Sequence, residues 1–208
     1  YKRQAREIAQ KILTRGKKIS VVGVPKTIDN DLSFVGRTFG FETAVYRTSD
    51  IIRTACAEAR GAHRGIGLVK LMGRDSGFIA AYASLATSVV DFCLIPEIPI
   101  ELEGEHGLLK AIERRLEGSQ KSVVIVVSEG AGQNLFTNRE LNLDASGNVL
   151  HKDIGEFLQE KIKSHFSKTK PVYLKYFDPS YLIRGVPAQG TDSICLLYTS
   201  DAADDGLS

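Results

Sequence analysis

Two carboxylates, a lysine and a threonine crowd into the stretch PKTIDND, residues 25–31. One carboxylate can take the proton of an attacking hydroxyl, a second can help to hold a metal ion, and a lysine can neutralise charge on a phosphoryl group. Asp29, Asp31 and Lys26 therefore suit phosphoryl transfer, with the hydroxyl of Thr27 beside them. The same residue types are common in solvated turns, so the spacing alone leaves both interpretations open.

An arginine between two glycines occurs in MGRDSG, residues 72–77. Backbone N–H groups and the guanidinium of Arg74 would face the same space there, and arginine grips phosphate oxygens in a forked geometry. Ser76 is a candidate cap for the helix that follows. The alternative is a plain strand-to-helix turn with a surface arginine.

Two more polar segments follow apolar runs. Glu129, in SEGAG, comes after residues 123–127, where its carboxylate can accept hydrogen bonds from a sugar hydroxyl or serve as a helix cap or lysine partner. Tyr181 and Arg184 are three residues apart in DPSYLIR and could offer a phenol and a guanidinium to one phosphate. The alternative for this pair is a structural tyrosine with a surface arginine.

Alternating apolar runs and amphipathic stretches predict the elements that position these segments. Because ligands bind outside the carboxyl ends of strands in open α/β sheets, each polar segment stands where chemistry is expected. The alternation predicts an α/β, Rossmann-like layered fold with a largely parallel sheet. The predicted strands are residues 18–24, 65–71, 91–95, 121–127 and 172–177. The predicted helices are residues 41–60, 76–87, 106–117 and 153–166, and a first helix in which the chain begins, with its apolar face over residues 5–13 and a break at Gly16.

Composition narrows the possible functions. The 208 residues are 43% hydrophobic and 25% charged, which excludes a disordered, collagen-like or disulfide-dense protein. A net charge of +2 is too weak a field to indicate binding to nucleic acid or to a membrane. The three cysteines are odd in number and widely spaced, so neither a disulfide framework nor a CxxC metal site is expected, and a reducing cytoplasm is the default. The four histidines lack metal-ligand spacing. The chain also lacks GxGxxG after its first predicted strand and a P-loop motif.

Taken in order, the segments resemble the phosphofructokinase family, in particular its long-chain branch of kinetoplastid, plant and bacterial enzymes. The resemblance covers residues 1–194 and is carried by GVPKTIDNDLSFVGRTFGFETAV, GIGLVKLMGRDSGFIAAYASLA and YFDPSYLIRGVPA. It implies phosphoryl transfer, from ATP or pyrophosphate, to the 1-hydroxyl of fructose 6-phosphate with Mg²⁺, giving fructose 1,6-bisphosphate. It also implies a homo-oligomer, commonly a tetramer.

The resemblance implies a role for each candidate residue. Asp29 would be the base that takes the 1-hydroxyl proton, Thr27 would contact the sugar near that oxygen, and Asp31 would support metal and phosphoryl placement. Arg74 and Lys26 would stabilise charge on the transferring group. The residues implied to hold the sugar phosphate are Met72 and Gly73 through their backbone, Glu129 through sugar hydroxyls, and Tyr181 with Arg184 through the 6-phosphate.

The donor is the least determined part of this hypothesis. The family's glycine-rich GGDG loop, which separates ATP from pyrophosphate enzymes, is expected upstream of Tyr1, so we expect the chain to be truncated there and inactive alone. KTIDNDLSF, RTFGF and KLMGRDSGFIAA resemble ATP-using members, which favours ATP over pyrophosphate. Two competing hypotheses are a non-catalytic regulatory subunit of the same fold and an unrelated sugar-binding α/β protein.

The last residues resemble something other than a protein. CLLYTSDAADD, which begins at Cys195, is similar to one reading frame of a sequencing adapter. We therefore expect residues 195–208 to be a non-native tail, and a genuine acidic tail is the alternative.

Overall fold

A four-stranded parallel sheet forms the centre of the computed structural model, which describes residues 2–119, 121–136, 151–167 and 170–205. The strand order is β2-β3-β1-β4, and each neighbouring pair is parallel. The α/β fold with a largely parallel sheet is thereby confirmed, as are four of the five predicted strands. They are β1 (Gly65–Leu71), β2 (Phe92–Leu94), β3 (Ser122–Ser128) and β4 (Tyr173–Phe177).

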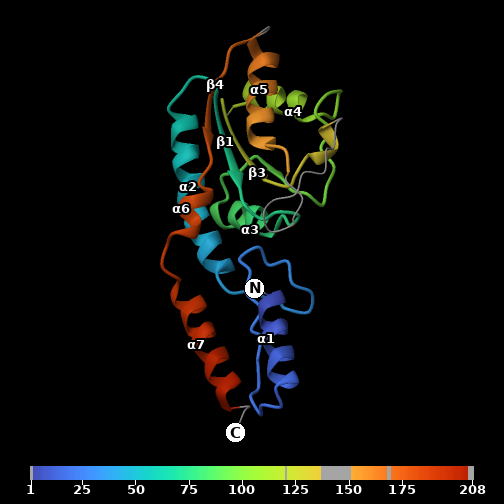
Figure 1. The fold of residues 1–208 in the computed structure, drawn as a ribbon. Coiled ribbons are helices and arrows are strands. Elements are labelled where there is room, and N and C mark those ends of the chain that lie inside the picture. The colour runs from blue at the N-terminus through green and yellow to red at the C-terminus, as the bar shows by residue number, and fades with distance from the viewer. Residues whose placement is uncertain (1, 120, 137–150, 168–169, 206–208) are drawn as a thin grey trace.

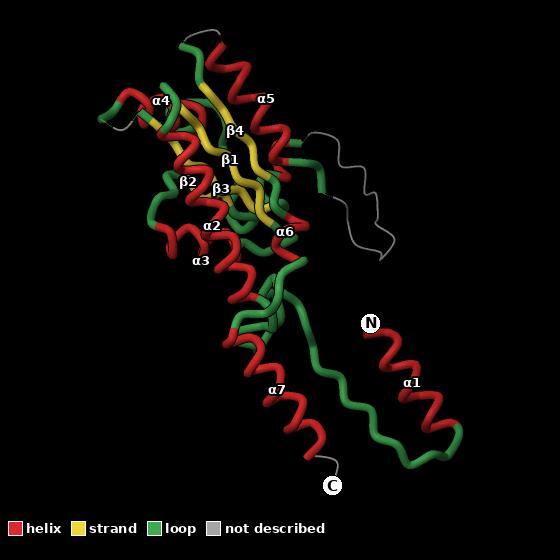
Figure 2. Tube along the Cα trace, turned by 90° about the vertical axis from the view of Figure 1, so that its left-hand side faces the viewer, coloured by secondary structure: helices red, strands yellow, loops and turns green. Residues whose placement is uncertain are grey.

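Helices cover both faces of this sheet (Figures 1 and 2). Successive side chains of a strand point to opposite faces. Leu68 of β1 therefore packs in the cluster with α4 (Leu108–Glu117) and α5 (Ile154–Ser167). Val69 packs in the cluster with α2 (Phe41–Arg60) and α3 (Phe78–Thr87). These four helices confirm four of the five predicted ones, with bounds that agree to within two residues.

Small residues let α2 lie close to β1. A Cβ atom on Gly67 would lie 2.7 Å from the carbonyl oxygen of Ala55, and one on Gly65 would collide with the carbonyl of Ala59. Larger side chains at these two strand positions would push the helix away. The C-terminal half of α2 is thereby held at a fixed distance from the sheet, and residues 25–40 lead into the other end of the helix.

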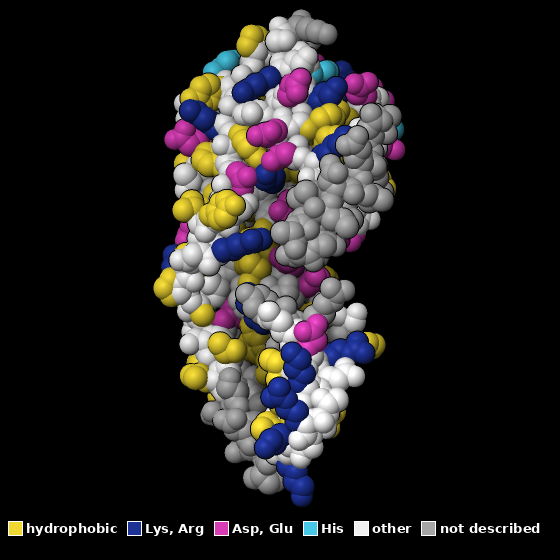
Figure 3. Space-filling model, in the orientation of Figure 1, with side chains coloured by type: hydrophobic (Ala, Val, Ile, Leu, Met, Phe, Trp, Pro, Cys, Tyr) yellow, Lys and Arg dark blue, Asp and Glu magenta, His cyan; other side chains and the backbone are white. Residues whose placement is uncertain are grey.

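Two further helices extend away from the sheet in the lower half of Figure 1. They are α1 (Lys2–Thr14) and α7 (Gly190–Asp205). Lysine and arginine side chains gather along α1 (Figure 3). The buried carboxylate of Asp192 ties α7 to the start of α2, because it accepts hydrogen bonds from the N–H groups of Gly40 (3.0 Å) and Thr43 (2.8 Å). The predicted tail boundary between residues 194 and 195 falls inside α7 and stays a prediction.

The predicted strand at residues 18–24 is wrong. This segment is extended but forms no strand, and Ile19 and Val22 are 61% and 54% exposed. A strand requires a neighbour that completes its backbone hydrogen bonds. Within the described residues the segment has no such neighbour, so its apolar, β-branched composition alone does not place it in the sheet.

Candidate active site

Three strand ends meet at one edge of the sheet. Leu71 at the end of β1 is paired with Ser128 at the end of β3, and Phe177 at the end of β4 is paired with Val69. The segments that follow these strands are therefore neighbours in space. They carry Arg74 after β1, Glu129 after β3, and the short helix α6 (Ser180–Arg184) after β4.

The turn after β1 is held by the carboxylate of Glu129. Its Oε1 atom accepts hydrogen bonds from the N–H groups of Gly73 (3.3 Å) and Arg74 (2.9 Å). Gly73 has φ 141° and Arg74 has φ 50°, values that a non-glycine residue adopts only where its surroundings enforce them. Gly130 is required beside the turn, because a Cβ atom there would collide with the carbonyl of Arg74. The backbone of the turn is thus fixed while the side chain of Arg74 is exposed.

Glu129 therefore has a structural role, because its Oε1 atom holds the turn after β1. The sequence left such a role open beside sugar binding. Within the described chain its second oxygen, Oε2, forms no hydrogen bond and stays available for another donor. Met72 is fully buried, so any contact of this residue with a ligand at the edge would come through its backbone. Contacts of Met72, Gly73 and Glu129 with a sugar stay predictions.

The segment with two aspartates is attached to the same edge through a pair of serines. Ser76 is buried and donates a hydrogen bond from Oγ to the carbonyl of Asp29 (3.0 Å). The carbonyl of Ser76 in turn accepts one from Oγ of Ser128 (3.2 Å), at the end of β3. Asp29 is thus tied to the sheet although it is remote in sequence from β1 and β3.

Ser76 has a different role from the predicted cap. The N-cap residue of α3 is Gly77, which has no side chain that could cap the helix. The Oγ atom of Ser76 accepts a long, weak hydrogen bond from the N–H of Phe78 (3.4 Å). Its shorter bond goes to Asp29, which the sequence analysis missed.

Four charged groups at this edge act on the carboxyl group of Asp29, namely Asp31, Arg74, Glu129 and Arg184, and we call these five residues the strand-end site. Burial raises the pKa of Asp29, and the negative charges of Asp31 and Glu129 raise it further. The positive charges of Arg74 and Arg184 act in the opposite direction, but the pKa of Asp29 is raised on balance. A carboxylate with a raised pKa is a stronger base, as proton abstraction from a hydroxyl requires.

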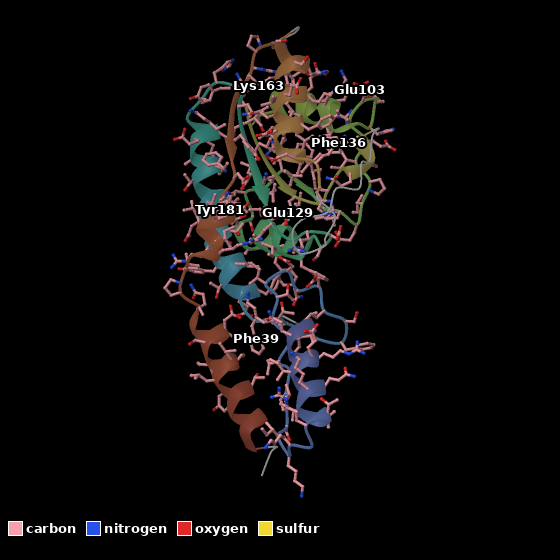
Figure 4. The ribbon with its side chains drawn as sticks, viewed as in Figure 1. Phe39, Glu103, Glu129, Phe136, Lys163 and Tyr181 are labelled. Carbon is pink, nitrogen blue, oxygen red and sulfur yellow. The ribbon has the colours of Figure 1, made fainter. Side chains whose placement is uncertain are left out.

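The remaining predicted residues lie at the surface of the site. Lys26 and Asp31 form no side-chain hydrogen bond within the described residues, and Asp31 is exposed. The Oγ1 atom of Thr27 accepts a hydrogen bond from the N–H of Asp29 (3.2 Å), which shapes the turn locally. Tyr181 is 88% exposed on α6, the same helix that carries Arg184 (Figure 4 labels Tyr181 and Glu129).

The structure also shows a charged group that the sequence analysis missed. Lys70, near the end of β1, forms ion pairs with Asp153 (2.6 Å) and Asp178 (2.8 Å). A lysine inside the otherwise apolar strand GIGLVKL was the available signal, because a buried ammonium needs partners.

The described part of the chain shows neither a metal centre nor a membrane-spanning helix. Within the described residues, no group of three or more His, Cys, Asp or Glu side chains is arranged to hold a metal ion. Among the helices of these residues, none is long and apolar enough to span a bilayer.

Known proteins resemble the chain closely. Residues 3–203 match the family described as Phosphofructokinase. The chain is 50% identical over 204 residues to "ATP-dependent 6-phosphofructokinase 7" of Arabidopsis thaliana, covering 96% of this chain and 42% of that relative. It is 48% identical over 202 residues to the ATP-dependent 6-phosphofructokinase of Borreliella burgdorferi, covering 94% of this chain and 45% of that relative.

Solved structures with a similar fold belong to the same group of proteins. The crystal structure of a pyrophosphate-dependent phosphofructokinase from Marinobacter aquaeolei is similar, with a TM-score of 0.63 and 25% sequence identity. The similarity covers 90% of this chain and 44% of that one. The chain thus spans less than half the length of the relatives it matches.

Proposed function

Because the chain belongs to the phosphofructokinase family, we propose that the whole protein transfers the terminal phosphoryl group of ATP to the 1-hydroxyl of fructose 6-phosphate, giving fructose 1,6-bisphosphate. One observation carries this proposal. Asp29 is a partly buried carboxylate of raised pKa that two arginines and two further carboxylates surround at the carboxyl edge of a parallel sheet. A base for the hydroxyl and cations for the phosphates are both available there.

In the proposed reaction the 1-hydroxyl oxygen forms a bond to the terminal phosphorus of ATP. The bond from that phosphorus to the bridging oxygen breaks, ADP leaves with that electron pair, and the hydroxyl proton goes to Asp29. Arg74 and Lys26 neutralise charge on the transferring group, which is the main contribution a protein makes to phosphoryl transfer. Thr27 orients the sugar near the attacking oxygen.

The sugar phosphate is assigned to the rest of the strand-end site. Arg184 and Tyr181 hold the 6-phosphate, since a guanidinium pairs with phosphate oxygens and both side chains are exposed on α6. Glu129 accepts hydrogen bonds from sugar hydroxyls through its second oxygen. Met72 and Gly73 contact the sugar through their backbone, and Glu129 holds the backbone of Gly73 in place.

Asp31 is the residue we assign to Mg²⁺. Mg²⁺ usually binds through one or two carboxylates together with phosphate oxygens and water, so an exposed carboxylate beside Asp29 fits this ion. The ion would supply positive charge to the phosphate oxygens of the donor. A second ligand is expected from residues beyond this chain.

ATP is the donor that the relatives favour. The two relatives at 48–50% identity are named ATP-dependent, whereas the similar structure at 25% identity is titled pyrophosphate-dependent. That title is the observation that supports pyrophosphate as the alternative donor. Parallel assays of the full-length protein with ATP and with pyrophosphate decide between them.

The whole protein is further proposed to be a cytoplasmic homo-oligomer. Cys56, Cys93 and Cys195 are free thiols, which supports a reducing compartment. Exposed apolar side chains outside the expected tail, among them Leu13 (76%) on α1 and Leu85 (78%) on α3, support contacts with further polypeptide.

Replacement of the base tests the reaction directly. In the full-length protein, Asp29→Ala should lower kcat by about 10²- to 10⁴-fold, because a positioned general base contributes that much. The Kd for fructose 6-phosphate should stay nearly unchanged. Formation of fructose 1,6-bisphosphate is followed by a coupled assay, and binding by calorimetry. Asp50→Ala, an exposed aspartate on α2, is the matched control and should keep wild-type turnover. More than about a tenth of wild-type turnover in Asp29→Ala would remove the base assignment.

A further inference from the structure

Lys70 connects three elements at the edge of the sheet. It is the penultimate residue of β1, and only 11% of its side chain is exposed. Its Nζ atom lies 2.6 Å from Oδ2 of Asp153 and 2.8 Å from Oδ2 of Asp178. Burial alone would lower the pKa of Lys70, but the bonds to the two aspartates outweigh burial and raise it. The ammonium group therefore stays charged between two carboxylates.

Each of these carboxylates uses its other oxygen to hold the start of a helix. Oδ1 of Asp153 accepts a hydrogen bond from the N–H of Glu156 (3.0 Å), in the first turn of α5. Oδ1 of Asp178 accepts hydrogen bonds from the hydroxyl (2.6 Å) and the N–H (3.3 Å) of Ser180, at the start of α6. Lys70 thus attaches both helix starts to the end of β1.

The second of these helices carries the side chains assigned to the 6-phosphate. Neither Tyr181 nor Arg184 forms a side-chain hydrogen bond within the described residues, so their positions depend on the backbone of α6. That helix has two anchors. Ile183 is buried in the core, and Asp178 is bound by Lys70. Ile183 fixes the depth of the helix, and the ion pair fixes its N-terminal end.

We propose that Lys70 is a positioning residue for substrate binding, because through Asp178 it fixes α6, with Tyr181 and Arg184, against the turn that carries Arg74. This inference rests on the proposed function, since it concerns the binding of the sugar phosphate. Lys70 touches no reacting atom. Lys70 therefore affects the affinity for fructose 6-phosphate and not the affinity for the phosphoryl donor.

The test uses steady-state kinetics of the full-length protein. Lys70→Met should raise the KM for fructose 6-phosphate on the order of tenfold, while kcat and the KM for ATP change less than about threefold. Lys70→Arg keeps the charge and the donors, and should restore most of the affinity. Lys110→Met, which removes an exposed lysine paired with Glu113, is the matched control and should behave as wild type.

Two aspartate variants separate positioning from general stability. Asp178→Asn should raise the KM for fructose 6-phosphate, because this change weakens the link from Lys70 to α6. Asp153→Asn should lower the melting temperature, because it weakens the ion pair with Lys70. It should leave that KM within about twofold, since Asp153 holds α5 and not α6. In the variant that joins Lys70→Met with Asp178→Asn, the KM should be no higher than in Lys70→Met alone, because both changes break one link.

Each outcome decides a separate question. If the wild-type protein does not phosphorylate fructose 6-phosphate, the proposed function fails and the inference fails with it. If the wild type is active but Lys70→Met leaves the KM unchanged, only the inference fails. Equal increases of KM in Asp153→Asn and Asp178→Asn would overturn the link through α6. If Lys70→Met does not fold, the comparison of Asp178→Asn with Asp153→Asn still shows whether the link to α6 controls the KM for fructose 6-phosphate.

Discussion

Glu129 is the residue whose replacement separates the two roles that its oxygens offer. Oε1 holds the N–H groups of Gly73 and Arg74, and Oε2 is assigned to a sugar hydroxyl. Glu129→Gln keeps an acceptor at this position and removes the charge. Glu129→Ala removes both oxygens and leaves the two N–H groups of the turn without a partner.

The magnitudes follow from the number and kind of these bonds. A hydrogen bond to a charged group contributes about 1.5–3 kcal/mol, about twice the value for a neutral pair. The alanine variant should therefore lose about 2–3 kcal/mol of unfolding free energy, because one of the two bonds is long at 3.3 Å. The glutamine variant should lose about 1 kcal/mol. Displacement of the Arg74 side chain with its backbone should lower kcat/KM in both variants, more in Glu129→Ala than in Glu129→Gln.

Urea unfolding without substrate and the pH dependence of kcat/KM give the two measurements. Loss of stability without substrate reports the bonds to the turn, because a sugar contact cannot contribute there. The negative charge of Glu129 helps to raise the pKa of Asp29, so Glu129→Gln should move the acid limb of the pH profile to lower pH. Wild-type stability of Glu129→Ala together with an unmoved acid limb would refute the geometry described for Glu129.

Two further predictions concern the residues that hold the segments in place. Ser76→Ala removes the hydrogen-bond donor to the Asp29 carbonyl, a bond worth about 0.5–1.5 kcal/mol, and should lower kcat about two- to tenfold with little change in KM. Ser88 is an exposed serine at the end of α3, and Ser88→Ala is the control. An unchanged kcat in Ser76→Ala would contradict the link between Ser76 and Asp29. Asp192→Ala leaves the N–H groups of Gly40 and Thr43 without a cap and should cost about 1–3 kcal/mol of unfolding free energy in urea. A loss below about 0.5 kcal/mol would show that α7 does not cap α2.

The elements that the sequence predicts well are those whose own pattern contains the reason for their structure. Residues 65–71 form a short, mostly apolar run typical of a buried strand, and residues 41–60 combine an apolar face with a glycine just after the last helical residue. Residues 18–24 have a similar apolar pattern and yet form no strand. Strand formation depends on a neighbour elsewhere in the chain, and a local pattern carries no information about that neighbour.

The site is predictable as a set of residues but not as an arrangement. The motif spacing identifies Asp29, Arg74 and Arg184 as candidates, whereas the effect of Arg184 on Asp29 arises only because β4 lies beside β1. The same reason explains Glu129, whose bond to the Gly73 turn depends on the pairing of β1 with β3. Lys70 gave a weaker signal, because a charge near the end of a strand is also compatible with a solvated side chain.

The charge balance around Asp29 implies that the base becomes stronger as the proposed complex forms. Arg74 and Arg184 are the groups that lower the pKa of Asp29, and both are assigned to phosphate groups. Bound phosphates neutralise these cations, so their effect on Asp29 weakens and its pKa rises further. The pH profile of kcat reports the complex, and that of kcat/KM reports the free enzyme. The acid limb of kcat should consequently lie at the higher pH, and the opposite order would mean that the bound donor and its Mg²⁺ outweigh the lost effect of the arginines.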